Sequence, residues 1–104
     1  MIDYDAEFKA AGIDMVVCAR SRNYRKYFLN GFGVSLAQSE WTLGGNEGLW
    51  ELAVLHRRPH ARWFTICYTT AIASGLIGNL SVAEALALVA RIQALDITGK
   101  EVTV

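Results

Sequence analysis

Two runs of alternating character dominate the middle of the chain. Residues 49–56 and 62–68 are rich in β-branched, aromatic and aliphatic side chains, and the segment between them contains Pro59. Such runs on either side of a short turn predict a β-hairpin. Because side chains alternate between the two faces of a strand, one apolar row is expected on one face of the hairpin. The row comprises Trp50, Leu52 and Val54 with Phe64, Ile66 and Tyr68.

The other face of the predicted hairpin is mixed. Its positions are Glu51, Ala53, Trp63, Thr65 and Cys67. A sheet with one apolar and one mixed face usually packs helices on the apolar side and leaves the other side partly solvated. We therefore expect helices on one face of this sheet only.

Shorter elements are predicted before the hairpin. Residues 3–11 suit a short amphipathic helix that is capped by Asp3 or Asp5 and stopped by Gly12. The apolar run 13–19 predicts a strand, although the same run could begin a helix that continues through the next segment.

The following segment carries a helix signal. Ser21 can cap a helix over residues 21–30, and Gly31 can take the left-handed position that follows a helix end. Residues 32–37 then predict a short strand, and the glycine-rich residues 38–48 predict a loop. We expect that loop to be a turn, because a phosphate-binding loop would need a Lys-Ser/Thr step that opens a helix.

The last third of the chain contains the sharpest local signal. Ser81 and Glu84 form a capping box, which predicts a helix from residue 81 to about 95 after a semi-buried loop over 69–78. One side of this helix is apolar: Val82, Leu86, Leu88, Val89, Ile92 and Leu95. Residues 102–104 can add an edge strand.

The opposite side of that helix carries a strip of four alanines. The strip consists of Ala83, Ala87, Ala90 and Ala94. A solvent-facing helix side is normally charged, so a smooth strip indicates a second packed element, simple helix propensity, or contact between copies of the chain in a homo-oligomer.

These elements define the expected architecture. At 104 residues the chain is long enough for one domain with its own core. The prediction is a single α+β domain over residues 1–104, with an antiparallel sheet centred on the 49–56/62–68 hairpin and packed on one face by helices that include 81–95.

Composition limits the classes of function. Ten acidic and ten basic residues cancel, so no overall charge attracts the protein to nucleic acid or to an anionic membrane. Residues 63–83 carry no charge, but glycine and hydroxyl side chains dilute this stretch, and we expect no membrane span. The N-terminus has no secretory signal pattern, and we expect a cytoplasmic protein of a bacterial host.

Candidate catalytic and metal chemistry is weak. Cys18 and Cys67 lie within apolar runs, where buried thiols of a reducing compartment are usual. His56 and His60 bracket the hairpin tip, but no cysteine pair has zinc-ligand spacing. We therefore predict no catalytic residue, no metal and no cofactor.

Two basic groups interleaved with aromatic residues are the best candidate for a binding surface. One lies at the hairpin tip and the other at the segment 20–26, where no acid occurs. Arginine with tryptophan or tyrosine is typical of protein-binding hot spots, and the same pattern suits nucleic acid or a merely solvated tip. The predicted partner-binding residues are Arg57, Arg58, Arg62 and Trp63 with Arg22, Arg25 and Lys26.

The hairpin region also resembles a known group. The strings WELAVL at 50–55, ICYTTAI at 66–72 and LIGNLS at 76–81 resemble small phage and prophage accessory proteins. In that group a WELAVL strand precedes a CYDTPI strand end, an IGYL segment and a C-terminal helix. Thr69 and Ala71 stand where that pattern has Asp and Pro, so no role of those two positions carries over.

The resemblance spans about residues 49–95 and implies a small α+β accessory protein. Some phage proteins of this size inhibit CRISPR–Cas complexes by binding them without catalysis. The leading hypothesis is therefore a non-enzymatic inhibitor of a host protein complex, such as a CRISPR–Cas effector. The alternative is a small nucleic-acid-binding protein that uses its basic and aromatic groups.

Overall fold

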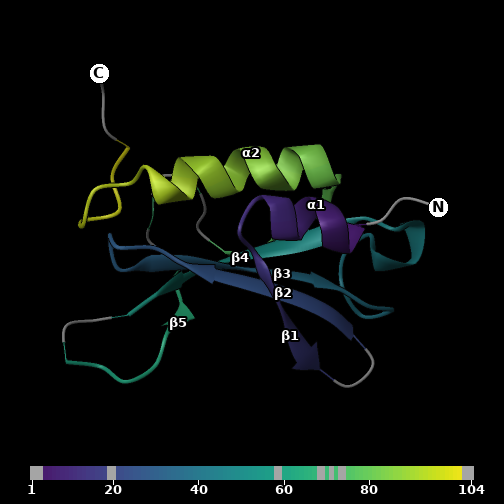
Figure 1. Ribbon diagram of the computed structural model, residues 1–104, viewed down its shortest axis with the longest axis horizontal. Coiled ribbons are helices and arrows are strands. Elements are labelled where there is room, and N and C mark those ends of the chain that lie inside the picture. The colour runs from purple at the N-terminus through teal and green to yellow at the C-terminus, as the bar shows by residue number, and fades with distance from the viewer. Residues whose placement is uncertain are drawn as a thin grey trace.

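A computed structural model describes residues 4–18, 21–57, 60–67, 70, 72 and 75–101. Its elements follow one another along the chain as α1 (Tyr4–Ala10), β1 (Asp14–Cys18), β2 (Ser21–Tyr27), β3 (Phe32–Gln38), η1 (Gly45–Glu47), β4 (Trp50–His56), β5 (Thr65–Ile66), β6 (Ile77–Leu80) and α2 (Val82–Gln93). The predicted α+β class is confirmed, with a helix at each end of a run of antiparallel strands (Figure 1).

The sheet is an antiparallel meander with a split edge. Strands β1 to β4 lie side by side in chain order, and each pairs with the next. β4 then pairs along its other edge with β5 near His56 and with β6 near Trp50. The segment around β5 lies on the side of the sheet away from both helices (Figure 1).

Both helices cover the same face of the sheet, as the alternating pattern of β4 predicts (Figure 1). The core beneath them is centred on Trp50, whose ring meets the rings of Phe8 and Tyr24 edge to face at centroid distances of 4.9 and 5.6 Å. Trp50, Leu52 and Val54 are fully buried, so this predicted row is confirmed. No helix of the described chain is long and apolar enough to span a membrane.

Helix α2 begins with the predicted capping box. The Ser81 hydroxyl accepts a hydrogen bond from the Glu84 backbone N–H at 3.1 Å, and the Glu84 carboxylate accepts one from the Ser81 N–H at 3.1 Å. Two of the unpaired donors at the helix start are thereby satisfied. The alanine strip Ala83, Ala87, Ala90 and Ala94 is exposed, so no element of the described chain packs on it.

The C-terminal end of α2 is held by a side chain from the β2–β3 turn. The Asn30 amide nitrogen donates to the carbonyl oxygens of Ile92, Gln93 and Leu95 at 3.0, 3.2 and 2.9 Å. The side-chain carbonyl oxygen of Asn30 accepts a hydrogen bond from the Phe32 backbone N–H at 3.0 Å. These bonds satisfy helix-end carbonyls and fix α2 against the β2–β3 turn.

The predicted helix over 21–30 is wrong, because residues 21–27 form β2. The segment alternates, with buried Tyr24 between Asn23 and Arg25, and it pairs with β1 on one edge and β3 on the other. Cross-strand pairing on both edges outweighs a cap signal and weak helix propensity. Gly31 does have a left-handed φ of +87°, but it lies in the turn between two strands.

The second hairpin strand is shorter than predicted and faces the other way. Only Thr65–Ile66 pairs with β4, and Ile66 stands opposite Leu55. Leu55 is one residue from Val54 and lies on the opposite face, so Ile66 does not join the Trp50 row and is 41% exposed. A shift of one residue exchanges the faces of a strand. Tyr68 lies outside the described residues.

Of the remaining secondary-structure predictions, some are confirmed and others are not. The strand over 13–19, the strand over 32–37 and the loop over 38–48 are confirmed, with η1 inside that loop. The loop prediction for 69–78 misses the start of β6 at Ile77. Asp3 and the proposed strand 102–104 lie outside the described residues, although Glu101 forms an isolated bridge with Leu95.

Candidate protein-binding site

Two segments far apart in the sequence meet on the helix-free face of the sheet. The rings of Tyr27, at the end of β2, and Phe64, just before β5, lie with centroids 4.3 Å apart and planes at 36°. Tyr27 reaches Phe64 across the backbone of Gly33, where a Cβ atom would come within 2.8 Å of the Tyr27 ring. Glycine at position 33 is therefore what allows the two rings to meet.

The row beneath these rings explains their position. Tyr27, Gly33, Leu55 and Ile66 are successive cross-strand neighbours on β2, β3, β4 and β5. Leu55 is only 7% exposed although no helix covers this face in the described chain. Its cross-strand neighbours in the row are Gly33 on β3 and Ile66 on β5.

Arg57 completes the stack. Its guanidinium carbon lies 5.4 Å from the centre of the Phe64 ring, and its backbone N–H donates to the Gly31 carbonyl oxygen at 3.0 Å. A guanidinium over an aromatic face gains a cation–π attraction, while its N–H donors stay in the guanidinium plane. Arg57 is thus fixed by its backbone hydrogen bond to Gly31 and by the contact of its guanidinium with the Phe64 ring. The guanidinium N–H groups can still donate hydrogen bonds to a carboxylate.

Arg62 and Trp63 directly precede Phe64 in the sequence. Both are exposed, and Trp63 is 78% exposed, which is a large apolar surface to leave in water. We call Tyr27, Arg57, Arg62, Trp63 and Phe64 the aromatic–arginine cluster. It combines the residue types that dominate the energy of protein interfaces.

Lys26 and Arg22, which are also predicted to bind a partner, lie away from the cluster. The Lys26 ammonium donates to the Ala11 carbonyl oxygen at 2.9 Å and lies 5.6 Å from the centre of the Phe28 ring, so it joins α1 to the sheet. Arg22 is exposed but lies five positions before Tyr27 on β2, roughly 16 Å away at strand spacing. The structure therefore does not bring Lys26 or Arg22 into the cluster.

Arg25 lies nearer the cluster, and Arg58 is outside the described residues. Arg25 is half-buried on the helix-free face, where Ser35 and Ala53 are its successive cross-strand neighbours. Its Nε atom is buried and has no hydrogen-bond partner among the described residues. Arg25 thus borders the aromatic–arginine cluster on the same face.

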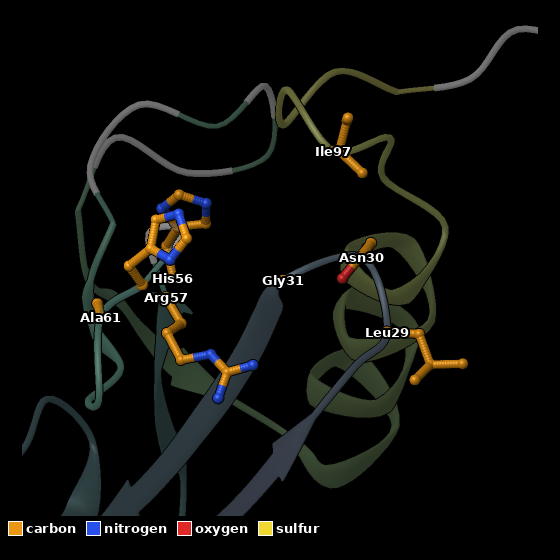
Figure 2. Close-up of a pocket in the computed structure, with 8 residues that line it drawn as sticks. Leu29, Asn30, Gly31, His56, Arg57, Ala61 and Ile97 are labelled. Carbon is orange, nitrogen blue, oxygen red and sulfur yellow. The ribbon is translucent and has the colours of Figure 1, made fainter.

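A pocket lies beside the cluster, at the end of the sheet where three loops converge (Figure 2). Its volume is about 580 Å³. One wall is the β2–β3 turn with Leu29 and Asn30, the second is His56 at the end of β4 with His60 from the β4–β5 connection, and Ile97 comes from the chain after α2. Figure 2 shows Arg57 running from the hairpin wall away from His56.

The sequence predicts Phe64 in the core row and gives His56 no binding role, whereas Tyr27 is expected on a contact surface as part of a helix. The structure places Phe64 on the helix-free face, half-buried against Tyr27. The signal for Tyr27 was present in the alternation of β2, since a strand over 21–27 places Tyr27 on the same face as Arg25. The helix prediction for that segment concealed it.

The carboxylates with clearly shifted pKa values lie outside this site. The pKa of Glu84, at the start of α2, is lowered mainly by a hydrogen bond from the Ser81 backbone N–H and to a smaller extent by one with the Ser81 side chain. Hydrogen bonds from the Thr98 side chain and the Lys100 backbone lower the pKa of Asp96 after the end of α2. Both carboxylates have structural roles at the helix ends.

Metal chemistry has no support in the part of the chain that the structure describes, where no three His, Cys, Asp or Glu side chains come close enough to hold an ion. Comparisons with family models, with curated protein sequences and with solved structures give no match. The functional argument therefore depends on the geometry of the aromatic–arginine cluster and its pocket.

Proposed function

We propose that this protein acts by binding another protein through the aromatic–arginine cluster, without catalysing a reaction. The observation that carries the proposal is the stack of Arg57 on Phe64 and of Phe64 on Tyr27, on the sheet face without helices. Tryptophan, tyrosine and arginine are the residues most enriched at the centres of protein interfaces.

The order of the cluster supports this function. Tyr27 belongs to a central strand, and Arg57 is hydrogen-bonded to Gly31 through its backbone. Ordering a flexible side chain on binding costs roughly 0.5–1.5 kcal/mol, and side chains that are already in place avoid much of that cost. Trp63 is exposed at the border and can bury its indole in a pocket of a partner.

The charge of the cluster indicates an acidic partner surface. Arg57 and Arg62 are exposed guanidinium groups, and no ion pair to either occurs among the described residues. Guanidinium groups bind carboxylates with two parallel hydrogen bonds. In keeping with the resemblance of residues 49–95 to phage accessory proteins, we propose that the partner is a host protein complex, such as a CRISPR–Cas effector, and that binding inhibits it.

The test is affinity capture from a bacterial host lysate with tagged wild-type protein, with and without nuclease. We expect a stoichiometric protein partner that survives nuclease treatment and is lost from an Arg57→Gln, Phe64→Ala double variant. Arg22→Gln is the matched control, because it removes an exposed arginine from the same sheet at a distance from the cluster. Circular dichroism of all variants checks that the fold is retained.

Two results would contradict the proposal. Partners that disappear with nuclease, together with a steep loss of binding as salt rises, would favour the nucleic-acid alternative. A protein partner that the double variant retains in full would mean that the contact surface lies elsewhere.

A further inference from the structure

The pocket beside the aromatic–arginine cluster has two chemically different walls. The hairpin wall carries the imidazole side chain of His56 (Figure 2), and His60 also lines the pocket. The facing wall carries the exposed aliphatic side chain of Ile97, whereas the fully exposed Leu29 side chain points away from the histidine wall (Figure 2). At about 580 Å³ the pocket is large enough for one or two side chains of a partner.

The polar wall is held in place by the fold. The His56 ring stacks on the Phe32 ring at a centroid distance of 4.6 Å and an angle of 29°. Stacking fixes the plane of the imidazole and leaves the ring nitrogens at its edge. His60 has a left-handed backbone with φ +68°, a conformation that few residues other than glycine, asparagine, aspartate and histidine adopt readily.

These groups can bind an anion. A neutral imidazole donates one hydrogen bond and a protonated imidazole donates two. Arg57 also lines the pocket, but its side chain runs away from His56 (Figure 2) and its guanidinium lies over the Phe64 ring, so the imidazoles are the donors on this wall. The described lining of the pocket contains no aspartate or glutamate, so nothing there neutralises these donors.

The remaining polar groups nearby are already used. Asn30 donates its amide to the end of α2 and accepts from Phe32, so it has a structural role. The Asp96 carboxylate, next in sequence to Ile97, accepts hydrogen bonds from the Thr98 hydroxyl and from the Thr98 and Lys100 N–H groups. The donors that face a ligand are therefore the imidazole N–H groups of His56 and His60.

We infer that this pocket receives an acidic side chain of the partner protein together with a neighbouring aliphatic side chain. The carboxylate binds to His56 and His60, and the aliphatic group packs on Ile97. This inference rests on the proposed function and adds the partner's chemistry: an Asp or Glu next to a Leu, Ile or Val on the surface that meets the aromatic–arginine cluster.

The apolar wall favours a protein carboxylate over a nucleic-acid phosphate. Ile97 is an exposed aliphatic side chain, which matches the side chain of a leucine and does not match a phosphate. Binding to a nucleic-acid backbone usually uses several Lys and Arg side chains, whereas the described lining of this pocket contributes Arg57 alone.

The test is an NMR titration of the ¹⁵N-labelled full chain with a small probe, N-acetyl-Leu-Glu-amide. We expect saturable shifts of the amide signals of Gly31, Ala61 and Ile97, with a dissociation constant on the order of 1 mM for a ligand of this size. The neutral probe N-acetyl-Leu-Gln-amide should bind roughly tenfold more weakly, because it lacks the charge that the donors bind.

Two variants separate the walls of the pocket. His60→Asn keeps a residue that tolerates the left-handed backbone and removes the imidazole, and it should weaken binding of the acidic probe severalfold. Ile97→Ser should weaken both probes by a similar factor, because it removes apolar contact and no charge. Arg22→Gln is the control and should leave both affinities unchanged.

Three outcomes would overturn the inference. The acidic probe could cause no saturable shift at the pocket, the two probes could bind equally, or inorganic phosphate could bind more tightly than the acidic dipeptide. Shifts confined to the cavity at the start of α2, lined by Glu7, Glu47 and Leu86, would also contradict it.

The inference and the proposed function fail separately. If the dipeptide does not bind but partner capture still requires Phe64 and Arg57, only the pocket assignment is wrong. If the dipeptide binds as expected but capture does not depend on the aromatic–arginine cluster, the proposed function is wrong and the carboxylate site remains.

Discussion

The two faces of the sheet use aromatic side chains in opposite ways. On the face beneath the helices, Trp50 and Phe8 are fully buried and meet edge to face at a centroid distance of 4.9 Å. On the helix-free face, Tyr27 is 50% exposed and stacks on Phe64, which in turn lies beneath Arg57. The same strands carry both arrangements, because alternate residues point to opposite faces.

The difference separates stability from recognition. The Trp50 group excludes water completely and contributes free energy of folding in proportion to its buried area. The Phe64 group leaves apolar and cationic surface in contact with water, which contributes less to folding and remains available to a partner.

Trp50→Ala should have the largest effect on stability. Removal of a fully buried tryptophan that packs on Phe8 and Tyr24 should lower the free energy of unfolding by about 3–5 kcal/mol. Urea denaturation followed by circular dichroism measures the change. Trp41→Ala is the control, because Trp41 is 67% exposed and its removal should change stability by less than about 0.5 kcal/mol.

Asn30→Ala should come second. The variant removes the donor to the Ile92, Gln93 and Leu95 carbonyl oxygens and the acceptor of the Phe32 N–H, and we expect a loss of roughly 1–3 kcal/mol. Hydrogen exchange should quicken at the C-terminal end of α2 more than at its capped start. Equal quickening along the whole helix would contradict a local role for Asn30.

Phe64→Ala should sharpen the contrast between the faces. Loss of its ring pair with Tyr27 and its contact with Arg57 should lower stability by about 0.5–1.5 kcal/mol, well below the Trp50→Ala effect. Affinity for the captured partner should fall at least about tenfold, as for a hot-spot residue. A Phe64→Ala loss of stability as large as that of Trp50→Ala would show that Phe64 belongs to the core.

Glu84→Gln should have the smallest effect, and one that depends on pH. Hydrogen bonds from Ser81 lower the pKa of Glu84 in the folded state, so its carboxylate stabilises the fold above about pH 4.5 and loses this contribution as pH falls through the lowered pKa. Glutamine at this position does not titrate. The stability difference between wild type and variant at pH 7 should therefore shrink in acid, which urea midpoints at both pH values measure.

Local signals predicted much of the covered side of the fold. Ser81 and Glu84 specify the start of α2 within four consecutive residues, and the alternation of Trp50, Leu52 and Val54 specifies a strand with one buried face. Both signals act over a few neighbouring residues, so a single sequence carries them.

The open side depended on long-range pairing and was predicted less well. Ser21 and Gly31 suggest a helix locally, but pairing with β1 and β3 makes residues 21–27 a strand. The register of Ile66 opposite Leu55 decides the face of the short β5 strand, and nothing near Ile66 in the sequence specifies that register. The Tyr27–Phe64 contact requires both the strand conformation of residues 21–27 and the register of β5. It could not be predicted without these two features.

Hydroxyl-radical footprinting of the free protein and of its complex with the captured partner tests the central claim most directly. Trp63 and Trp41 are 78% and 67% exposed, and they lie in connections at opposite ends of β4, so each is a control for the other. We predict that partner binding strongly reduces oxidation of Trp63 and leaves that of Trp41 unchanged. Protection of Trp41 with no change at Trp63 would contradict it.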